Sequence, residues 1–272
     1  MNQDISTTEN KVPDGTEINH RIKKNWKNKY KRFALAALGS IPWVGGIISG
    51  LGAMNAENEQ GKINELQVQW IEEYQTRLLE LVDMLNDVCA RFDELGEEID
   101  ERIQSSEYIS LVKKAFRLWD SAETDEKKQY IKNLLTNSAA VSLCPDDLIR
   151  LFMDWIETYH EAHFKVIRVI YQNPGAGRGD IWDQISKERP REDSADADLY
   201  KLLIRDLSTG GVIRQARETD YNGNYLLKRH HRSKSSSGIA KSAFDNSDPY
   251  VLTELGKQFV HYTMNEVVKR IE

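Results

Sequence analysis

Two histidines with a glutamate between them, His160, Glu161 and His163, are the residues best suited by type to metal chemistry. A zinc-protease helix places its two histidines four residues apart, so that both imidazoles lie on one face beside the glutamate base. Here the histidines are three residues apart, and no third ligand stands at a suitable spacing. We therefore expect both histidines to lie on a helix surface, without a bound metal.

Other catalytic patterns are equally incomplete. Gly175, Gly177 and Gly179 resemble a phosphate-binding loop, but no predicted strand precedes them and no Lys-Ser or Lys-Thr follows, so we expect a turn between helices. Cys89 and Cys144 are too few for a disulfide framework or a four-cysteine zinc site, which favours a reducing, cytoplasmic setting. We expect neither enzymatic activity nor a cofactor.

A concentration of basic residues between Arg214 and Lys241 is the clearest chemical signal in the chain. Such a segment can neutralise phosphates without reading bases, although a solvated insertion has the same composition. The whole chain has 37 Lys and Arg against 43 Asp and Glu, a formal charge of −6. This balance excludes a uniformly basic nucleic-acid coat and confines any phosphate contact to local patches.

The N-terminal part of the chain alternates sharply in charge. Residues 1–19 have no periodicity and are predicted to be a disordered tail. Residues 20–54 contain a basic stretch with seven Lys and Arg and then an uncharged segment, 33–54, with five glycines and one proline. Residues 55–144 begin with a strongly acidic region. We predict these as three separate pieces, followed by a C-terminal domain over 145–272.

The uncharged segment 33–54 is long enough for one membrane-spanning helix. Its glycines and Pro42 instead favour two short helices with a bend. Two interpretations stay open: a hairpin buried in a helical bundle, or insertion into an anionic membrane next to the basic stretch. The residues that we assign to membrane contact or self-association are Lys27, Lys29, Lys31, Trp43, Gly46, Ile47, Ile48 and Gly50.

A heptad pattern follows the apolar segment. Its apolar residues recur in steps of three and four, at Ile71, Tyr74, Leu78, Leu81, Leu85, Val88, Phe92, Leu95 and Ile99. This spacing predicts a long helix over 56–102, with Gly96 as its weak point, that forms a homo-oligomeric coiled coil or an intramolecular bundle. Further helices are predicted over 106–141, and Cys144-Pro145 marks the boundary between two domains.

The C-terminal domain has a different pattern. We predict one long amphipathic helix from Asp146 to Asn173, a short helix near Asp180, and a third helix from Ser194 to Thr209. The third helix is predicted to bury four leucines, Leu199, Leu202, Leu203 and Leu207. A hairpin is predicted between 212–215 and 225–227 because Asn222-Gly223 favours a type I′ turn. A last helix is capped by Thr253.

This order of elements, with the sequence YVLTELGKQFV, resembles the winged helix-turn-helix superfamily, in particular its prokaryotic regulator branch, over residues 162–271. The resemblance implies that 194–209 is a recognition helix, that 214–243 is an enlarged wing, and that the domain binds duplex DNA. The contact residues expected from these two elements are Tyr200, Lys201, Arg205, Arg214, Arg217, Lys228, Arg229, Arg232 and Lys234.

One feature of the third helix departs from this family pattern. Asp193, Asp196 and Asp198 stand at its start, where carboxylates repel phosphate. Winged helices also bind proteins, so DNA and a protein partner both stay open.

The sequence as a whole predicts a mainly α protein: an N-terminal helical bundle or coiled coil with a Gly-rich apolar hairpin, then a winged-helix domain with a small β-hairpin wing. The predicted function is a non-enzymatic regulatory binding protein that self-associates through its N-terminal half. The alternative is a membrane-inserting effector at the inner face of the membrane. Its basic lead, apolar hairpin and long helices resemble helical pore-forming and cell-death proteins, including those of bacterial defence systems.

Overall fold

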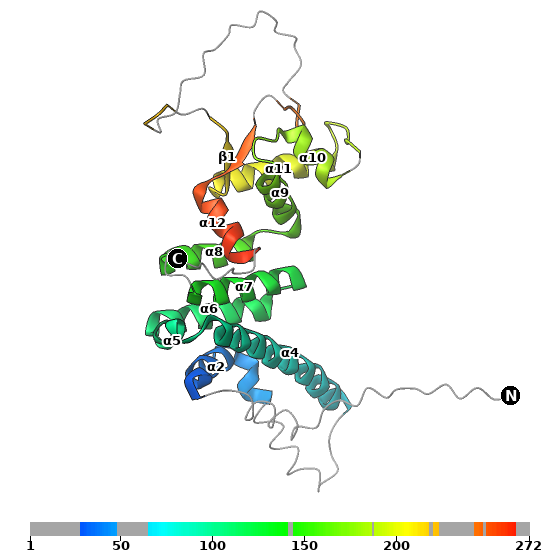
Figure 1. The fold of residues 1–272 in the computed structure, drawn as a ribbon. Helices are drawn as coiled ribbons and strands as arrows, with labels where there is room; N and C mark the ends of the chain where they lie inside the picture. The colour runs from blue at the N-terminus through cyan, green and yellow to red at the C-terminus, as the bar shows by residue number, and fades with distance from the viewer. Residues whose placement is uncertain are drawn as a thin grey trace, which may run out of the picture. The chain divides into compact units, whose positions relative to one another are not determined.

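The computed structural model describes residues 28–47, 65–140, 144–186, 188–217, 220–222, 242–246 and 249–264. The chain divides into two compact units: unit 1, Met1–Met153 with Val268–Glu272, and unit 2, Asp154–Val267. The boundary predicted from the sequence is at 144–145. The described residues are mainly helical with one antiparallel pair of short strands near the C-terminus, which confirms the predicted fold class (Figure 1).

The described part of unit 1 consists of helices. They are η1 (Asn28–Tyr30), α2 (Lys31–Leu38), a short helix over 42–47, α4 (Glu65–Leu95), η2 (Glu97–Ile99), α5 (Asp100–Gln104), α6 (Ser106–Ser121), α7 (Asp125–Ala140) and the start of α8 (Asp146–Thr158). The predicted continuous helix over 56–102 is wrong at its end. Gly96 has a φ of 87°, a left-handed conformation that ends α4.

The heptad residues of α4 pack within the chain. The six from Leu78 to Leu95 are buried: Leu78, Leu81, Leu85, Val88, Phe92 and Leu95. The ring of Phe33 in α2 packs edge-on at 5.3 Å from Phe92 and at 6.0 Å from Phe116 in α6. α2 contacts α6, α6 contacts α7, and α7 contacts α4, so this stripe forms the core of an intramolecular bundle (Figure 1).

The described part of the apolar segment packs one face into this core, while Leu35 on the other face is 70% exposed. The expected bend separates α2 from the helix over 42–47. Ile47 is only 1% exposed, and the indole N–H of Trp43 donates to the Asp120 carboxylate at 3.0 Å. Gly46 is exposed on the second helix. In the part of the chain that the structure describes, no helix is long and apolar enough to cross a membrane.

The described end of the basic stretch contacts the acidic helices of unit 1. The Lys29 ammonium lies 2.9 Å from the Asp100 carboxylate, and the Tyr30 hydroxyl donates to Asp93 at 2.6 Å. The Asp100 hydrogen bond raises the pKa of Lys29 to about 12. Lys31 is exposed. Of the other assigned membrane residues, Lys27, Ile48 and Gly50 lie outside the described residues.

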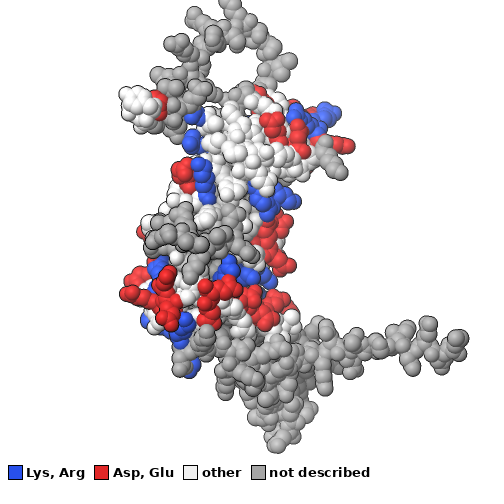
Figure 2. Space-filling model, in the orientation of Figure 1, with Lys and Arg blue, Asp and Glu red and all other residues white. Residues whose placement is uncertain are grey.

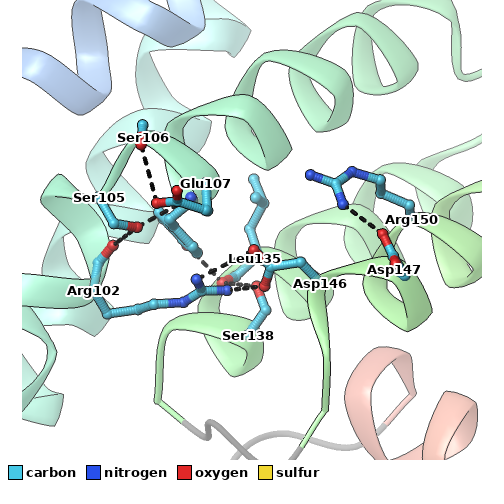
Figure 3. A network of polar contacts seen from close by, with 10 residues as sticks. Arg102, Ser105, Ser106, Glu107, Leu135, Ser138, Asp146, Asp147 and Arg150 are labelled. Carbon is cyan, nitrogen blue, oxygen red and sulfur yellow. Dashed lines mark hydrogen bonds and ion pairs between the residues drawn. The ribbon is translucent and has the colours of Figure 1, made fainter.

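A polar network fixes the start of α8 to the bundle of unit 1 (Figure 3). The Arg102 guanidinium pairs with Asp146 in the first turn of α8 and lies 5.2 Å from the ring centroid of Tyr108. Tyr108 is fully buried, its hydroxyl donates to the Leu135 carbonyl at 2.8 Å, and burial raises its pKa. Four elements, α5, α6, α7 and α8, therefore meet at Arg102 and Tyr108.

Unit 2 contains the end of α8, α9 (Glu161–Gln172), α10 (Arg178–Ile185), α11 (Ala195–Thr209), β1 (Ile213–Gln215), β2 (Tyr250–Leu252) and α12 (Glu254–Thr263). The predicted single helix from Asp146 to Asn173 is wrong, because α8 ends at Thr158 and α9 begins at Glu161. His160 has an extended backbone, and its N–H donates to Nδ1 of His163 at 3.1 Å. This contact caps α9 and separates the two helices.

The two short strands of unit 2 bring together segments that are far apart in sequence. β1 pairs with β2 in antiparallel register, with Ile213 opposite Leu252. The Thr253 side chain then caps α12 by accepting from the Gly256 N–H at 2.9 Å, while its hydroxyl donates to the Gly211 carbonyl at 2.6 Å. A Cβ at position 256 would collide with the Val212 carbonyl oxygen, so this turn requires glycine. The predicted strand 225–227 lies outside the described residues.

Candidate nucleic-acid interface

A groove of about 570 Å³ lies in unit 2 between the C-terminal half of α11 and the two strands. Its lining consists of Arg178, Ile204, Arg205, Ser208, Thr209, Ile213, Arg214, Gln215, Arg217 and Tyr250. Four of these described lining residues are arginines and none is an aspartate or glutamate. Figure 2 shows Lys and Arg side chains on the edge of unit 2 where Figure 1 labels β1. The groove is thus a local basic site on an acidic chain.

Arg178 is held in a defined position at the first residue of α10. Its Nε and Nη2 donate to the Tyr250 hydroxyl at 3.1 and 2.9 Å, and its guanidinium carbon lies 5.6 Å from the Tyr250 ring centroid. The Tyr200 hydroxyl donates to the Arg178 carbonyl at 2.6 Å. Arg178 is not among the predicted contact residues. Its place at the start of the second helix of the predicted motif was the available signal.

Arg205, Arg214 and Arg217, three of the predicted contact residues, lie in this groove. The side chain of Arg205 on α11 is 71% exposed, with Nε 3.4 Å from an Asp206 carboxylate oxygen. Arg214 is half-buried in β1, and Arg217 is exposed just after it. Side chains from α10, α11 and the β1 region therefore converge on one groove.

Lys201, another predicted contact residue, is not among the described residues that line this groove. Lys201 donates from Nζ to the Glu192 carbonyl and to Asp198, each at 3.3 Å. The basic residues of the predicted wing, Lys228, Arg229, Arg232 and Lys234, lie outside the described residues.

The prediction that Tyr200 faces outward is wrong. Tyr200 is 1% exposed, its ring stacks at 5.7 Å on Phe244, and burial raises its pKa. The predicted burial of Leu199 and Leu202 is also wrong, since these side chains are 50% and 37% exposed. The predicted burial of Leu203 and Leu207 is confirmed. With Ala197, Tyr200 and Ile204 they form the inner face of α11, at helical spacing.

The segment Ser242–Asn246, which precedes β2, is fastened to α10 and to the residues before α11. The Glu192 carboxylate accepts from the Ser242 hydroxyl and, at 2.9 Å, from the Ala243 N–H, which together lower its pKa. Asn246 accepts from the Gly179 N–H at 2.6 Å and donates to Asp180 at 2.8 Å. Glu192 and Asn246 therefore fix this segment at the base of the predicted wing. Neither residue carries a recognisable signal in the sequence.

The Gly-rich turn before α10 makes this close approach possible. A Cβ at Gly177 would collide with Asn246, and a Cβ at Gly179 would lie 2.7 Å from the Phe244 carbonyl oxygen. Gly177 is the N-cap of α10 and Gly179 lies in its first turn, so the predicted turn between two helices ends before Gly179; both glycines allow close packing.

The histidine pair has a structural arrangement. His160 is exposed, whereas His163, predicted on the surface, is 5% exposed and stacks at 5.0 Å on the Tyr159 ring. Its Nε2 lies 3.9 Å from an Asp206 carboxylate oxygen. Within the described ranges, no three His, Cys, Asp or Glu side chains gather to hold a metal. Burial raises the pKa of Cys89 to about 12 and that of Cys144 to about 11.

Comparison with protein-family models, with curated proteins and with solved structures gave no match. Functional inference therefore depends on the residues and geometry of this chain.

Proposed function

We propose that unit 2 is a winged-helix module that binds duplex DNA through its phosphates. The observation that supports this most directly is the convergence of Arg178, Arg205, Arg214 and Arg217 on one groove. Guanidinium groups form charge-assisted, often bidentate hydrogen bonds with phosphate oxygens. Each phosphate that they neutralise releases condensed counterions, which favours binding at low salt.

The groove residues would contribute in different ways. Arg178 is already held by the Tyr250 hydroxyl, so it would lose little conformational freedom when it contacts a phosphate. Arg205 and Arg217 are exposed at the groove and would contact the DNA backbone there. Basic residues of the predicted wing, Lys228, Arg229, Arg232 and Lys234, would add further phosphate contacts. We propose no catalytic role and no cofactor.

Unit 1 would serve self-association and hold the module in a cytoplasmic homo-oligomer. The heptad residues from Leu78 to Leu95 are used inside the bundle, so contact between copies would need other surfaces of unit 1. On the face drawn in Figure 2, acidic side chains gather over this unit.

The alternative function, membrane insertion, has weaker support. Phe33, Ile41 and Ile47 of the apolar segment are buried, and the first of these packs on aromatic rings of α4 and α6. Insertion would require these side chains to leave the core, which costs about 1.5–3 kcal/mol for each one before lipid compensates.

A binding titration with matched variants tests the proposed function. The full chain is titrated onto a fluorescent DNA duplex, and the anisotropy is compared for wild type, R205A/R214A/R217A and K113A/R117A/K165A. The second triple variant removes the same number of positive charges from exposed positions on α6 and α9. We expect the groove variant to bind at least about tenfold more weakly, and the control to stay within about threefold of wild type.

Equal affinities of the groove variant and wild type would refute phosphate contact at the groove. That result would favour a protein partner for unit 2. Replacing Lys228, Arg229, Arg232 and Lys234 with alanine tests the contribution of the predicted wing separately. Circular dichroism confirms that each variant keeps its helical content.

A further inference from the structure

We infer that unit 2 binds the sugar–phosphate backbone of duplex DNA without selecting base sequence. This inference rests on the proposed function and concerns what α11 can read. A recognition helix normally presents its N-terminal residues to base edges in the major groove. The exposed side chains in the first turn of α11 are carboxylates, and its exposed cationic side chains, Lys201 and Arg205, stand further along the helix.

The first turn of α11 repels DNA. Asp196 and Asp198 are exposed there, and Asp193 lies just before the helix in a pair with Arg191 at 2.9 Å. The Ser194 hydroxyl accepts from the Ala197 N–H at 3.2 Å, so the cap is already formed within the chain. An aspartate can accept from a cytosine amino group, but these carboxylates must first approach two rows of phosphates. The end of the helix that would enter the major groove is thus electrostatically unsuited to it.

The middle of α11 offers little to discriminate bases. Leu199 and Leu202 are its exposed apolar side chains, and their contact with DNA would be limited to surfaces such as the thymine methyl group. Lys201 is engaged by the Glu192 carbonyl and by Asp198. The aromatic side chain of Tyr200 points into the core, where it stacks on Phe244.

The cationic residues gather at the opposite end of the helix. Arg205 lies in the last turns of α11, beside Ser208 and Thr209, and shares the groove with arginines from α10 and the β1 region. Several guanidinium groups around one groove suit a run of phosphates, whereas reading a guanine needs one arginine aligned with a base edge. DNA bound by this groove is therefore contacted through its backbone, at the end of α11 remote from the acidic turn.

A panel of duplexes tests this inference with the full chain. Duplexes of equal length and unrelated sequence, covering A·T-rich and G·C-rich compositions, compete for binding at one salt concentration. We expect their affinities to agree within about threefold, whereas a base-reading protein loses about 5- to 150-fold for each mismatched base pair. One duplex with an affinity tenfold or more higher than that of the others would overturn the inference, because a single base contact changes affinity by about this factor.

Two variants sharpen the test. D196A/D198A removes the repelling carboxylates, and we expect it to bind every duplex more tightly by the same factor. L199A/L202A removes the exposed leucines, and we expect the ranking of duplexes to stay unchanged. A sequence-dependent response in either variant would show that α11 reads bases. Absence of binding to every duplex would overturn the proposed function and this inference together, whereas selective binding would overturn the inference alone.

Discussion

Removal of one hydroxyl group, in Tyr250→Phe, separates the positioning of Arg178 from its charge. The Tyr250 hydroxyl accepts two hydrogen bonds from the Arg178 guanidinium, at 3.1 and 2.9 Å, while the ring beneath it is buried. Phenylalanine keeps the ring and frees the guanidinium. Binding must then order a flexible arginine, which costs about 0.5–1.5 kcal/mol and weakens DNA affinity by about 2- to 13-fold.

The salt dependence distinguishes this variant from Arg178→Ala. In Tyr250→Phe the positive charge remains, so the slope of log affinity against log salt concentration should equal that of wild type. Arg178→Ala removes one phosphate contact, so its slope should be smaller in magnitude by about 0.9. Fluorescence anisotropy across a salt series measures both quantities. Unchanged affinity in Tyr250→Phe would refute positioning by the hydroxyl, and a reduced slope in that variant would show that more than positioning was lost.

Three further predictions concern the framework. Gly256→Ala should lower the free energy of unfolding by about 1–3 kcal/mol in urea titrations, because its Cβ meets the Val212 carbonyl. The control Gly46→Ala, at an exposed position, should be neutral or stabilising by up to about 1 kcal/mol. Equal effects of the two substitutions would contradict the packing argument. Ile47→Asp should destabilise unit 1 by about 3–5 kcal/mol, because it places a charge in the core. The wild-type chain should not float with anionic vesicles. If it does float, and Ile47→Asp abolishes the flotation, the result would support membrane insertion. Burial raises the pKa of the Cys89 thiol from 9.0 to about 12. Its thiolate population at about pH 8.5 should therefore be about a thousandfold below that of the unfolded chain. Iodoacetamide should therefore modify Cys89 only on unfolding, as peptide mass spectrometry can measure, and rapid native labelling would refute this burial.

Local signals in the sequence were sufficient to predict caps, bends and helix ends, which depend on neighbouring residues. Thr253 and Gly256 form a cap within one turn, and the glycine is required by a carbonyl close by in the fold. Gly96 was the expected weak point of the long acidic helix, and its left-handed conformation ends α4 there. The bend in the apolar segment likewise followed from glycine and proline.

The face of α11 could not be chosen from its own sequence. Leu199 and Leu202 fit one helical stripe and Ala197 and Tyr200 fit another, and both stripes are apolar. In the fold, Trp182 of α10 and Phe244, which precedes β2, both pack on the Tyr200 ring and bury its stripe. The spacing of apolar residues therefore predicted the helix correctly. It wrongly predicted that two leucines are buried and that Tyr200 is exposed.

The groove was also only partly accessible to sequence analysis. Arg205, Arg214 and Arg217 stand close together in sequence and share one predicted motif. Arg178 joins them through a hydrogen bond to Tyr250, which lies 72 residues away. A contact over such a separation depends on the pairing of β1 with β2, which the sequence did not specify.

The salt dependence of DNA binding by the groove variant tests the central claim most directly. Affinities of wild type and R205A/R214A/R217A for one duplex are measured by anisotropy from about 50 to about 200 mM salt. Three lost phosphate contacts should reduce the magnitude of the slope by about 2.7, so wild type should lose about 40-fold more affinity over this range than the variant. Identical slopes would contradict phosphate binding at this groove.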